Sequence, residues 1–249
     1  MIDALLKRRM WLWKNRWFSG LGTILIFPVT LMLLITFSFK NIFVNSLSNM
    51  PFDTWILTGL LYIVSSISMF PVLYREFFNL RIHRKMLVHV SLAPYSKKKI
   101  IFGYLTVATI ESIVIGIVSF LIFCLFIPIK LTVIEILISI FLLIIYLYTL
   151  GNLIITVCLL SESITTFFFI TIVILMIILF GNGFIIEFPF FPLVMEKILK
   201  TQPLSLQFQT LQLFINGGYF EWINIIICVL ILGFWTLSNS YLFQRKLRQ

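Results

Sequence analysis

The sequence predicts an all-α membrane protein with six transmembrane helices. Only 11% of the 249 residues are charged, whereas a soluble domain has about 25%. Hydrophobic residues make up 61% of the chain, and the mean hydropathy is +1.09. So few charged side chains cannot cover the surface of a water-soluble globule this large. The apolar residues are gathered into long runs, which favours helices that cross a lipid bilayer.

Six apolar runs have the length that a transmembrane helix needs, about 20 residues. They cover residues 21–39, 54–74, 100–127, 132–160, 164–180 and 222–243. The third and fourth runs exceed one bilayer thickness, so we expect them to tilt or to project beyond the membrane. Residues 127–131 and 161–163 are short connections, which make their flanking helices antiparallel neighbours.

The basic residues predict which ends of these helices face the cytoplasm. Fifteen of the 19 Lys and Arg residues lie before the first span, between the second and third, or after the sixth. The other four, Lys40, Lys130, Lys197 and Lys200, lie on the opposite side. Cytoplasmic loops of membrane proteins carry the excess of Lys and Arg. We therefore expect a multi-pass protein with both termini in the cytoplasm, and we attribute the net charge of +10 to topology rather than to nucleic-acid binding.

Residues 1–18 precede the first span and have an amphipathic pattern. One face would carry Ile2, Leu5, Leu6, Met10, Trp13 and Trp17. Lys7, Arg8 and Lys14 lie off this face, which is typical of a helix in the membrane interface. Arg9 and Arg16 interrupt the apolar stripe, although long arginine side chains can extend toward water. The alternative is a flexible basic tail.

Two further segments lie outside the predicted spans. Residues 75–99 alternate apolar and basic side chains, and we expect a short amphipathic cytoplasmic helix that ends before Pro94. Residues 181–219 are apolar but are broken by glycines and by Pro189, Pro192 and Pro203. This pattern predicts short re-entrant or interfacial helices on the outer side.

The sequence contains no recognisable catalytic or metal-binding constellation. It has no HExxH or GxSxG motif and no Gly-Lys pair, so it has no phosphate-binding loop of the Walker A type. His83 and His89 lack a Cys or carboxylate at ligand spacing. The three cysteines lie in apolar runs without CxxC spacing, which favours buried structural residues. We expect no catalytic residue, no metal and no cofactor on this chain, and no ATP hydrolysis by the chain alone.

Two polar residues lie within predicted spans. Glu111 is a carboxylate in the third span, where a charge is costly and needs a partner or a wet cavity. It is a candidate pathway or gating residue, or it bonds to a neighbouring hydroxyl such as Thr109 or Ser112. Asn152, in the fourth span, leaves the same two interpretations open.

The order of these elements resembles the type-2 permeases of ATP-binding-cassette exporters. Pro28 with Phe37 is similar to the proline–phenylalanine pattern of that family's first span. The stretch 86–97 followed by Gly103 resembles its cytoplasmic signature, and the stretch 202–205 resembles its Asn-Pro-Leu-Thr segment. The chain departs from the family at residues 83–85, which are basic instead of acidic, and at Gln209 and Gln212. The departures affect the subfamily and hence the substrate.

The resemblance implies a permease subunit in a bacterial inner membrane, paired with a second copy or a close homologue. Two separate ATPase subunits would bind ATP and Mg²⁺. The loop helix would act as the coupling helix that contacts the ATPase. Its candidate contact residues are Arg81, His83, Arg84, Lys85, Met86, Leu87, His89, Leu92 and Pro94.

The substrate class implied by the resemblance is hydrophobic or amphipathic, such as a drug or a peptide antibiotic. Export of a lipid-linked polysaccharide is an alternative within the family. Outside the family, the alternatives are an ion-coupled carrier and a membrane-bound lipid-modifying enzyme. A carrier normally has several intramembrane charges or broken spans, and an enzyme would need an interfacial cluster of carboxylates or histidines.

Overall fold

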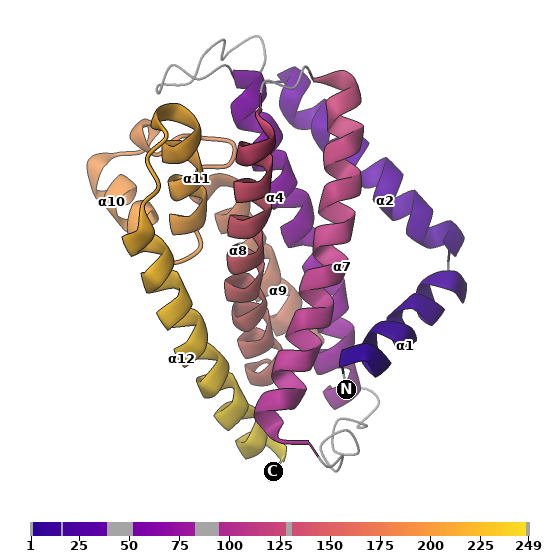
Figure 1. Cartoon of the computed structure of the whole chain (residues 1–249). Helices are drawn as coiled ribbons and strands as arrows, with labels where there is room; N and C mark the ends of the chain where they lie inside the picture. Colours follow the sequence, from indigo (N-terminus) through magenta and orange to yellow (C-terminus); the bar gives the residue numbers. More distant parts are fainter. Residues whose placement is uncertain (1, 16, 39–51, 83–94, 128–130, 248–249) are drawn as a thin grey trace.

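The computed structural model describes residues 2–15, 17–38, 52–82, 95–127 and 131–247. Within these ranges the chain is helical and contains no β-strand. The elements form a bundle with both ends of the described chain at the same, lower end in Figure 1. Their bounds are α1 Ile2–Asn15, α2 Trp17–Met32, η1 Leu33–Phe37, α4 Phe52–Leu73, η2 Tyr74–Asn79, α5 Leu80–Ile82, α7 Lys97–Phe126, α8 Val133–Leu160, α9 Ile164–Met176, η3 Ile177–Gly181, η4 Phe188–Phe190, α10 Leu193–Thr201, α11 Leu206–Gly217 and α12 Trp222–Leu247.

Among the described residues, five helical segments are long and apolar enough to cross a membrane by themselves. They are Phe52–Ile82, Lys97–Phe126, Val133–Leu160, Ile164–Gly181 and Trp222–Lys246. A sixth span is reached only if α1 and α2, which are bent by 94°, count together. The all-α membrane class is therefore confirmed, with five to six candidate spans. Whether α1 lies in the membrane interface stays a prediction.

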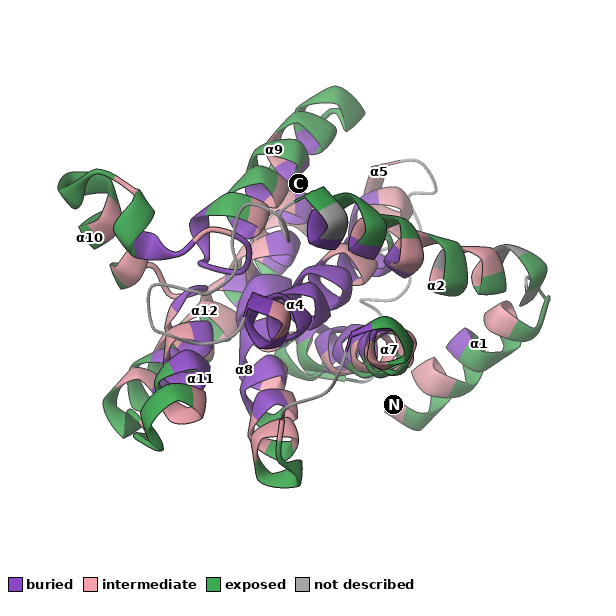
Figure 2. Ribbon diagram, turned by 90° about the horizontal axis from the view of Figure 1, so that it is seen from above, coloured by how far each residue is buried: buried purple, intermediate pink, exposed green. Residues whose placement is uncertain are grey.

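The helix that contains α4 lies at the centre of the bundle. In its most apolar stretch 83% of the residues are buried, compared with 22–39% in the other four candidate spans. Figure 2 shows α4 enclosed by its neighbours, with exposed residues mainly on the outer helices. The apolar residues exposed on those outer helices form a surface that lipid can cover, because a bilayer core removes the need for polar groups there.

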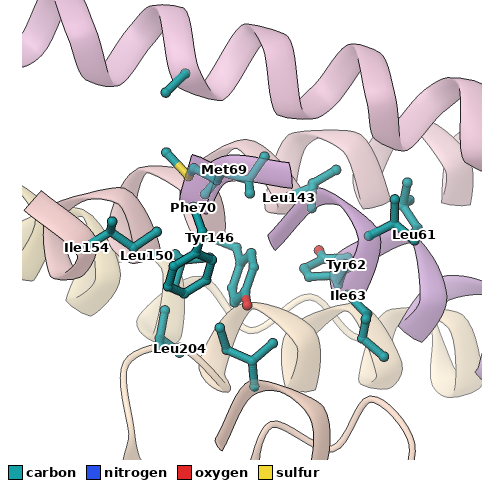
Figure 3. Packing of buried hydrophobic residues seen from close by; sticks show 14 of the residues in the cluster. Leu61, Tyr62, Ile63, Met69, Phe70, Leu143, Tyr146, Leu150, Ile154 and Leu204 are labelled. Atoms are coloured by element: carbon teal, nitrogen blue, oxygen red, sulfur yellow. The ribbon is translucent and has the colours of Figure 1, made fainter. Parts of the chain in front are cut away.

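Aromatic rings fill the core beside α4. The ring centroids of Tyr62 and Tyr146 lie 5.2 Å apart, and Phe184 and Phe208 pack against Tyr62 at 5.4 Å each. Figure 3 shows the two tyrosines side by side between α4 and α8. Pairs at these distances prefer tilted or edge-to-face geometry, as found here. The cluster fixes α11 and the segment around Phe184 to the central helix.

The second span is longer than expected. The loop was predicted to begin at Arg75, but the helix continues as a π-helix, η2, and then as α5 up to Ile82. Phe77 and Phe78 in η2 are fully buried, and Glu76 is only 4% exposed. The charged residues suggested a loop, whereas each finds a partner inside the fold. The remaining loop residues 83–94, including Pro94, lie outside the described residues.

The segment between α9 and α12 forms short helices, as its glycines and prolines suggest. Pro189 lies in η4, Pro192 precedes the first turn of α10, and Pro203 lies in the turn before α11. Helices α10 and α11 have 9 and 12 residues, too few to cross a bilayer. Helix α11 lies beside α8 and α12, and α10 lies farther out, next to α11 and η4, in the upper part of Figure 1. Whether they enter the membrane stays a prediction.

Candidate functional site

Five charged side chains meet where α1, η2 and α7 come together. Arg8 and Arg9 extend from α1, Arg75 and Glu76 from η2, and Glu111 from α7. We call these five residues the charged cluster. It joins the N-terminal helix to two long helices of the bundle, near the end where both chain termini lie (Figure 1).

Arg9 and Glu111 form the central pair of the charged cluster. Arg9 Nε donates to Glu111 Oε2 at 2.6 Å, and Arg9 Nη2 donates to Oε1 at 2.5 Å. Trp13 Nε1 adds a third bond to Oε1 at 2.8 Å. Arg9 is only 8% exposed. A two-pronged guanidinium–carboxylate bond fixes orientation as well as distance, so this pair sets how α1 lies on α7.

Glu76 is the second anion of the charged cluster. Arg8 donates to its carboxylate, Arg9 Nη1 lies 3.7 Å from Oε1, and Arg75 Nε lies 3.8 Å from Oε1. Arg8 also stands over the Tyr104 ring, 5.9 Å from its centroid. Three guanidinium groups therefore surround two carboxylates, and the charged cluster keeps one formal positive charge.

A cavity of about 550 Å³ lies beside the charged cluster, between α1, α2, α4 and α7. Its lining is mostly apolar, with charged side chains at one part of the wall. The lining residues are Arg9, Leu12, Trp13, Gly20, Ile24, Phe27, Ile67, Ser68, Pro71, Val72, Arg75, Glu111 and Ile115. We call this space the α1–α2 cavity. Its volume is in the range of pockets that hold small ligands.

Glu111 has the partner that its place in an apolar span required, but the partner was not foreseen. The hydroxyls of Thr109 and Ser112, the expected local partners, are buried and make no hydrogen bond to any residue that the structure describes. The actual partner, Arg9, is 102 residues away in the sequence. Two signals pointed to the pair: Arg9 interrupted the apolar face of the first helix, and Glu111 interrupted an apolar span. Neither observation identified which residue its partner would be.

Asn152 lies in a group of hydrogen-bonded side chains between α8 and α12. We call this group, Asn152, Thr156, Trp235, Thr236 and Asn239, the polar seam. Its Nδ2 donates to Thr236 Oγ1 at 3.2 Å, and Asn239 Nδ2 donates to its backbone oxygen at 2.8 Å. Thr156 donates to Asn239 Oδ1 at 2.7 Å and accepts a bond from Trp235 Nε1 at 2.9 Å. These bonds give Asn152 a role in holding two helices together. The structure does not bring Asn152 into the charged cluster.

Of the nine predicted coupling residues, the structure describes only Arg81. Its guanidinium donates to the backbone oxygens of Leu159 and Ser161, at the C-terminal end of α8. Cations are favoured at such helix ends because the last carbonyls lack partners within the helix. The other eight, His83, Arg84, Lys85, Met86, Leu87, His89, Leu92 and Pro94, lie outside the described residues.

The described residues contain no group of three or more His, Cys, Asp or Glu side chains that could hold a metal ion. Cys158 and Cys228 are buried, and Cys124 is partly buried. The charged cluster itself supplies ion pairs that link α1, η2 and α7.

The comparisons with known proteins identify the family. The family of ABC-2 type transporters matches residues 2–216, which include the charged cluster, Asn152, the loop 83–94 and most of the outer segment 181–219. The chain matches no curated protein and no solved structure. Since the match covers most of the chain, this protein is a multi-pass membrane permease of the ABC-2 type transporter family.

Proposed function

We propose that this chain is the transmembrane subunit of an ATP-driven exporter. The observation that carries the proposal is the family match over residues 2–216. The chain has no Walker A motif, so ATP and Mg²⁺ would bind to two separate ATPase subunits. A second copy of this chain, or a close homologue, would complete the translocation pathway. The substrate would be hydrophobic or amphipathic, for example a drug or a peptide antibiotic, and a lipid-linked polysaccharide is the alternative.

The charge distribution supports a cytoplasmic position for the ATPase subunits. Lys97, Lys98 and Lys99 begin α7, and Arg245 and Lys246 end α12, at the same lower end as α1 in Figure 1. Lys197 and Lys200 belong to α10 at the other end. By the positive-inside rule the lower end would face the cytoplasm of a bacterial cell. The protein would then reside in the inner membrane with both termini inside.

The helices on either side of the loop 83–94 support its role as the coupling element. The segment before it, Phe52–Ile82, is the central helix of the bundle, and the segment after it is α7, which packs along α4. Arg81 also attaches the start of the loop to the end of α8. A push on the loop would therefore move three long helices together as a rigid body, which is how nucleotide-driven closure could reach the pathway.

The pairing of Glu111 with Arg9 favours the exporter over an ion-coupled carrier. A carrier needs a carboxylate that can take up and release an ion, whereas the Glu111 oxygens already accept three short bonds. In an exporter Glu111 would act on gating indirectly, by keeping α1 attached to α7 while the helices move. Asn152 would likewise hold α8 and α12 together.

The test is whether the loop recruits and stimulates an ATPase. Leu87→Pro should abolish stimulated ATP hydrolysis while the permease still inserts, because proline inside a helix costs about 3 kcal/mol. Arg84→Glu with Lys85→Glu should weaken co-purification of the ATPase in a salt-dependent manner. Lys197→Glu, an exposed change on α10, is the matched control. Equal co-purification and equal hydrolysis in all three proteins would refute the proposed coupling role.

A further inference from the structure

We propose that the α1–α2 cavity is a binding site for one anionic phospholipid of the surrounding membrane. The lipid phosphate would lie against Arg75, at the charged part of the wall beside Arg9, and an acyl chain would occupy the apolar part of the cavity. A bound lipid would hold α1 and α2 at their observed angle and attach both helices to the bundle. This inference does not depend on transport or on an ATPase partner.

The charged cluster has unused capacity for an anion. Arg9 is more than nine-tenths buried, and its Nη1 makes no hydrogen bond among the described residues, with Glu76 Oε1 3.7 Å away. Arg75 also faces the cavity, its side chain 35% exposed and its Nε 3.8 Å from Glu76. Because the charged cluster carries one excess positive charge, one phosphate would balance it. A buried cation without full compensation is costly, so binding would be favourable.

The rest of the cavity suits a hydrocarbon chain. Beyond the charged part of the wall the lining is apolar, with Ile24 and Phe27 from α2 facing Ile67 and Val72 from α4. A free anion would leave this apolar surface uncovered, whereas an acyl chain would cover it and remove it from water, which is favourable. Charge and apolar surface together therefore select a lipid rather than a soluble phosphate.

The position of the cavity makes it accessible from the membrane. Figure 1 shows α1 and α2 meeting at an angle away from the bundle, and the cavity lies inside this angle. The outer surface of α2 exposes Leu21, Leu25 and Ile26, at 45%, 47% and 66%. The charged cluster lies toward the basic end of the bundle. A lipid headgroup of the leaflet at that end can reach it while the acyl chain points toward the bilayer centre.

The experiment uses the full chain, purified in detergent, with phosphatidylglycerol, phosphatidylcholine or inorganic phosphate added. Lipid retained on the protein is counted by native mass spectrometry, and the melting temperature is measured in parallel. We expect preferential retention of one phosphatidylglycerol and a rise in melting temperature with that lipid alone. Arg75→Gln should lower the apparent affinity by roughly tenfold or more, the effect of losing one charge-assisted contact.

Two further variants keep the test decisive. Lys98→Gln removes an exposed positive charge near the same end of the bundle and should retain phosphatidylglycerol like the unchanged protein. Ser68→Phe fills the cavity without changing any charge, and should also lose the lipid, even if Arg75→Gln fails to fold. Equal retention of both lipids, equal loss in Lys98→Gln, or stabilisation by inorganic phosphate alone would overturn the proposal.

Discussion

At the scale of single residues, the Arg9–Glu111 pair should be a major contributor to stability. Glu111→Gln would leave the buried Arg9 guanidinium without its main partner, and breaking a buried ion pair on one side costs about 3–5 kcal/mol. The double variant Arg9→Gln with Glu111→Gln should lose less than the sum of the single changes, because no charge is stranded. Thermal unfolding in detergent measures both. As a control, Lys246→Gln removes the pair with the exposed Glu162 and should cost less than about 1 kcal/mol.

Also at the residue scale, Gly59 allows the segment around Phe184 to approach the central helix. A Cβ at Gly59 would lie 2.3 Å from the Phe184 backbone oxygen, which accepts a 3.2 Å bond from Trp55 Nε1. Gly59→Ala should force this backbone away and destabilise the protein by about 1–3 kcal/mol. Gly233→Ala in α12 meets no atom within 4 Å and should be neutral or stabilising. Melting temperatures compare the two. Equal effects would contradict the close packing of residue 184 on α4.

At the scale of elements, the polar seam should hold α12 against α8. Asn239→Leu removes bonds to the backbone and side-chain oxygens of Asn152 and the bond that Thr156 donates to α12, while Thr156 can still donate to the Asn152 backbone oxygen. Hydrogen bonds between membrane helices contribute about 0.6 kcal/mol on average and up to about 1.7, so a loss of about 1–3 kcal/mol is expected in detergent unfolding. Ser238→Ala, whose hydroxyl bonds to Phe234 of the same helix, should change little. A similar melting temperature for both variants would show that these hydrogen bonds between α8 and α12 do not contribute to stability.

The helices also show which parts of the fold could be predicted from the sequence. Apolar run length predicts transmembrane helices well because a bilayer requires a minimum span, and α4, α7, α8, α9 and α12 each cover most or all of a predicted run. The helix that contains the second predicted span continues beyond residue 74 to Ile82, although Arg75 and Glu76 suggested a loop. Arg75 pairs with Glu76, and the other partners of Glu76, Arg8 and Arg9, lie on α1, far away in the sequence. Local patterns do not encode such long-range neutralisation, so the charged cluster could not be assembled from the sequence alone.

At the scale of the whole molecule, the distribution of basic residues should fix the orientation in the membrane. Tyr95 precedes α7, whose first turn carries Lys97, Lys98 and Lys99, and Tyr219 lies in the connection between α11 and α12. Both side chains are exposed, and replacing either leaves the charge count unchanged. In a chain without Cys124, Cys158 and Cys228, Tyr95→Cys should react with a membrane-impermeant maleimide only in inverted vesicles. Tyr219→Cys should react only in intact cells.

This pair of reactions also decides how many helices cross the bilayer between the two positions. If α7, α8 and α9 cross and neither α10 nor α11 does, the chain crosses three times from residue 95 to residue 219, so the two cysteines must lie on opposite sides. Labelling of both from the same side would mean that the short helices form a complete span or that one long helix does not cross. Labelling of Tyr95→Cys from outside would reverse the orientation, and an ATPase could then not reach the loop 83–94.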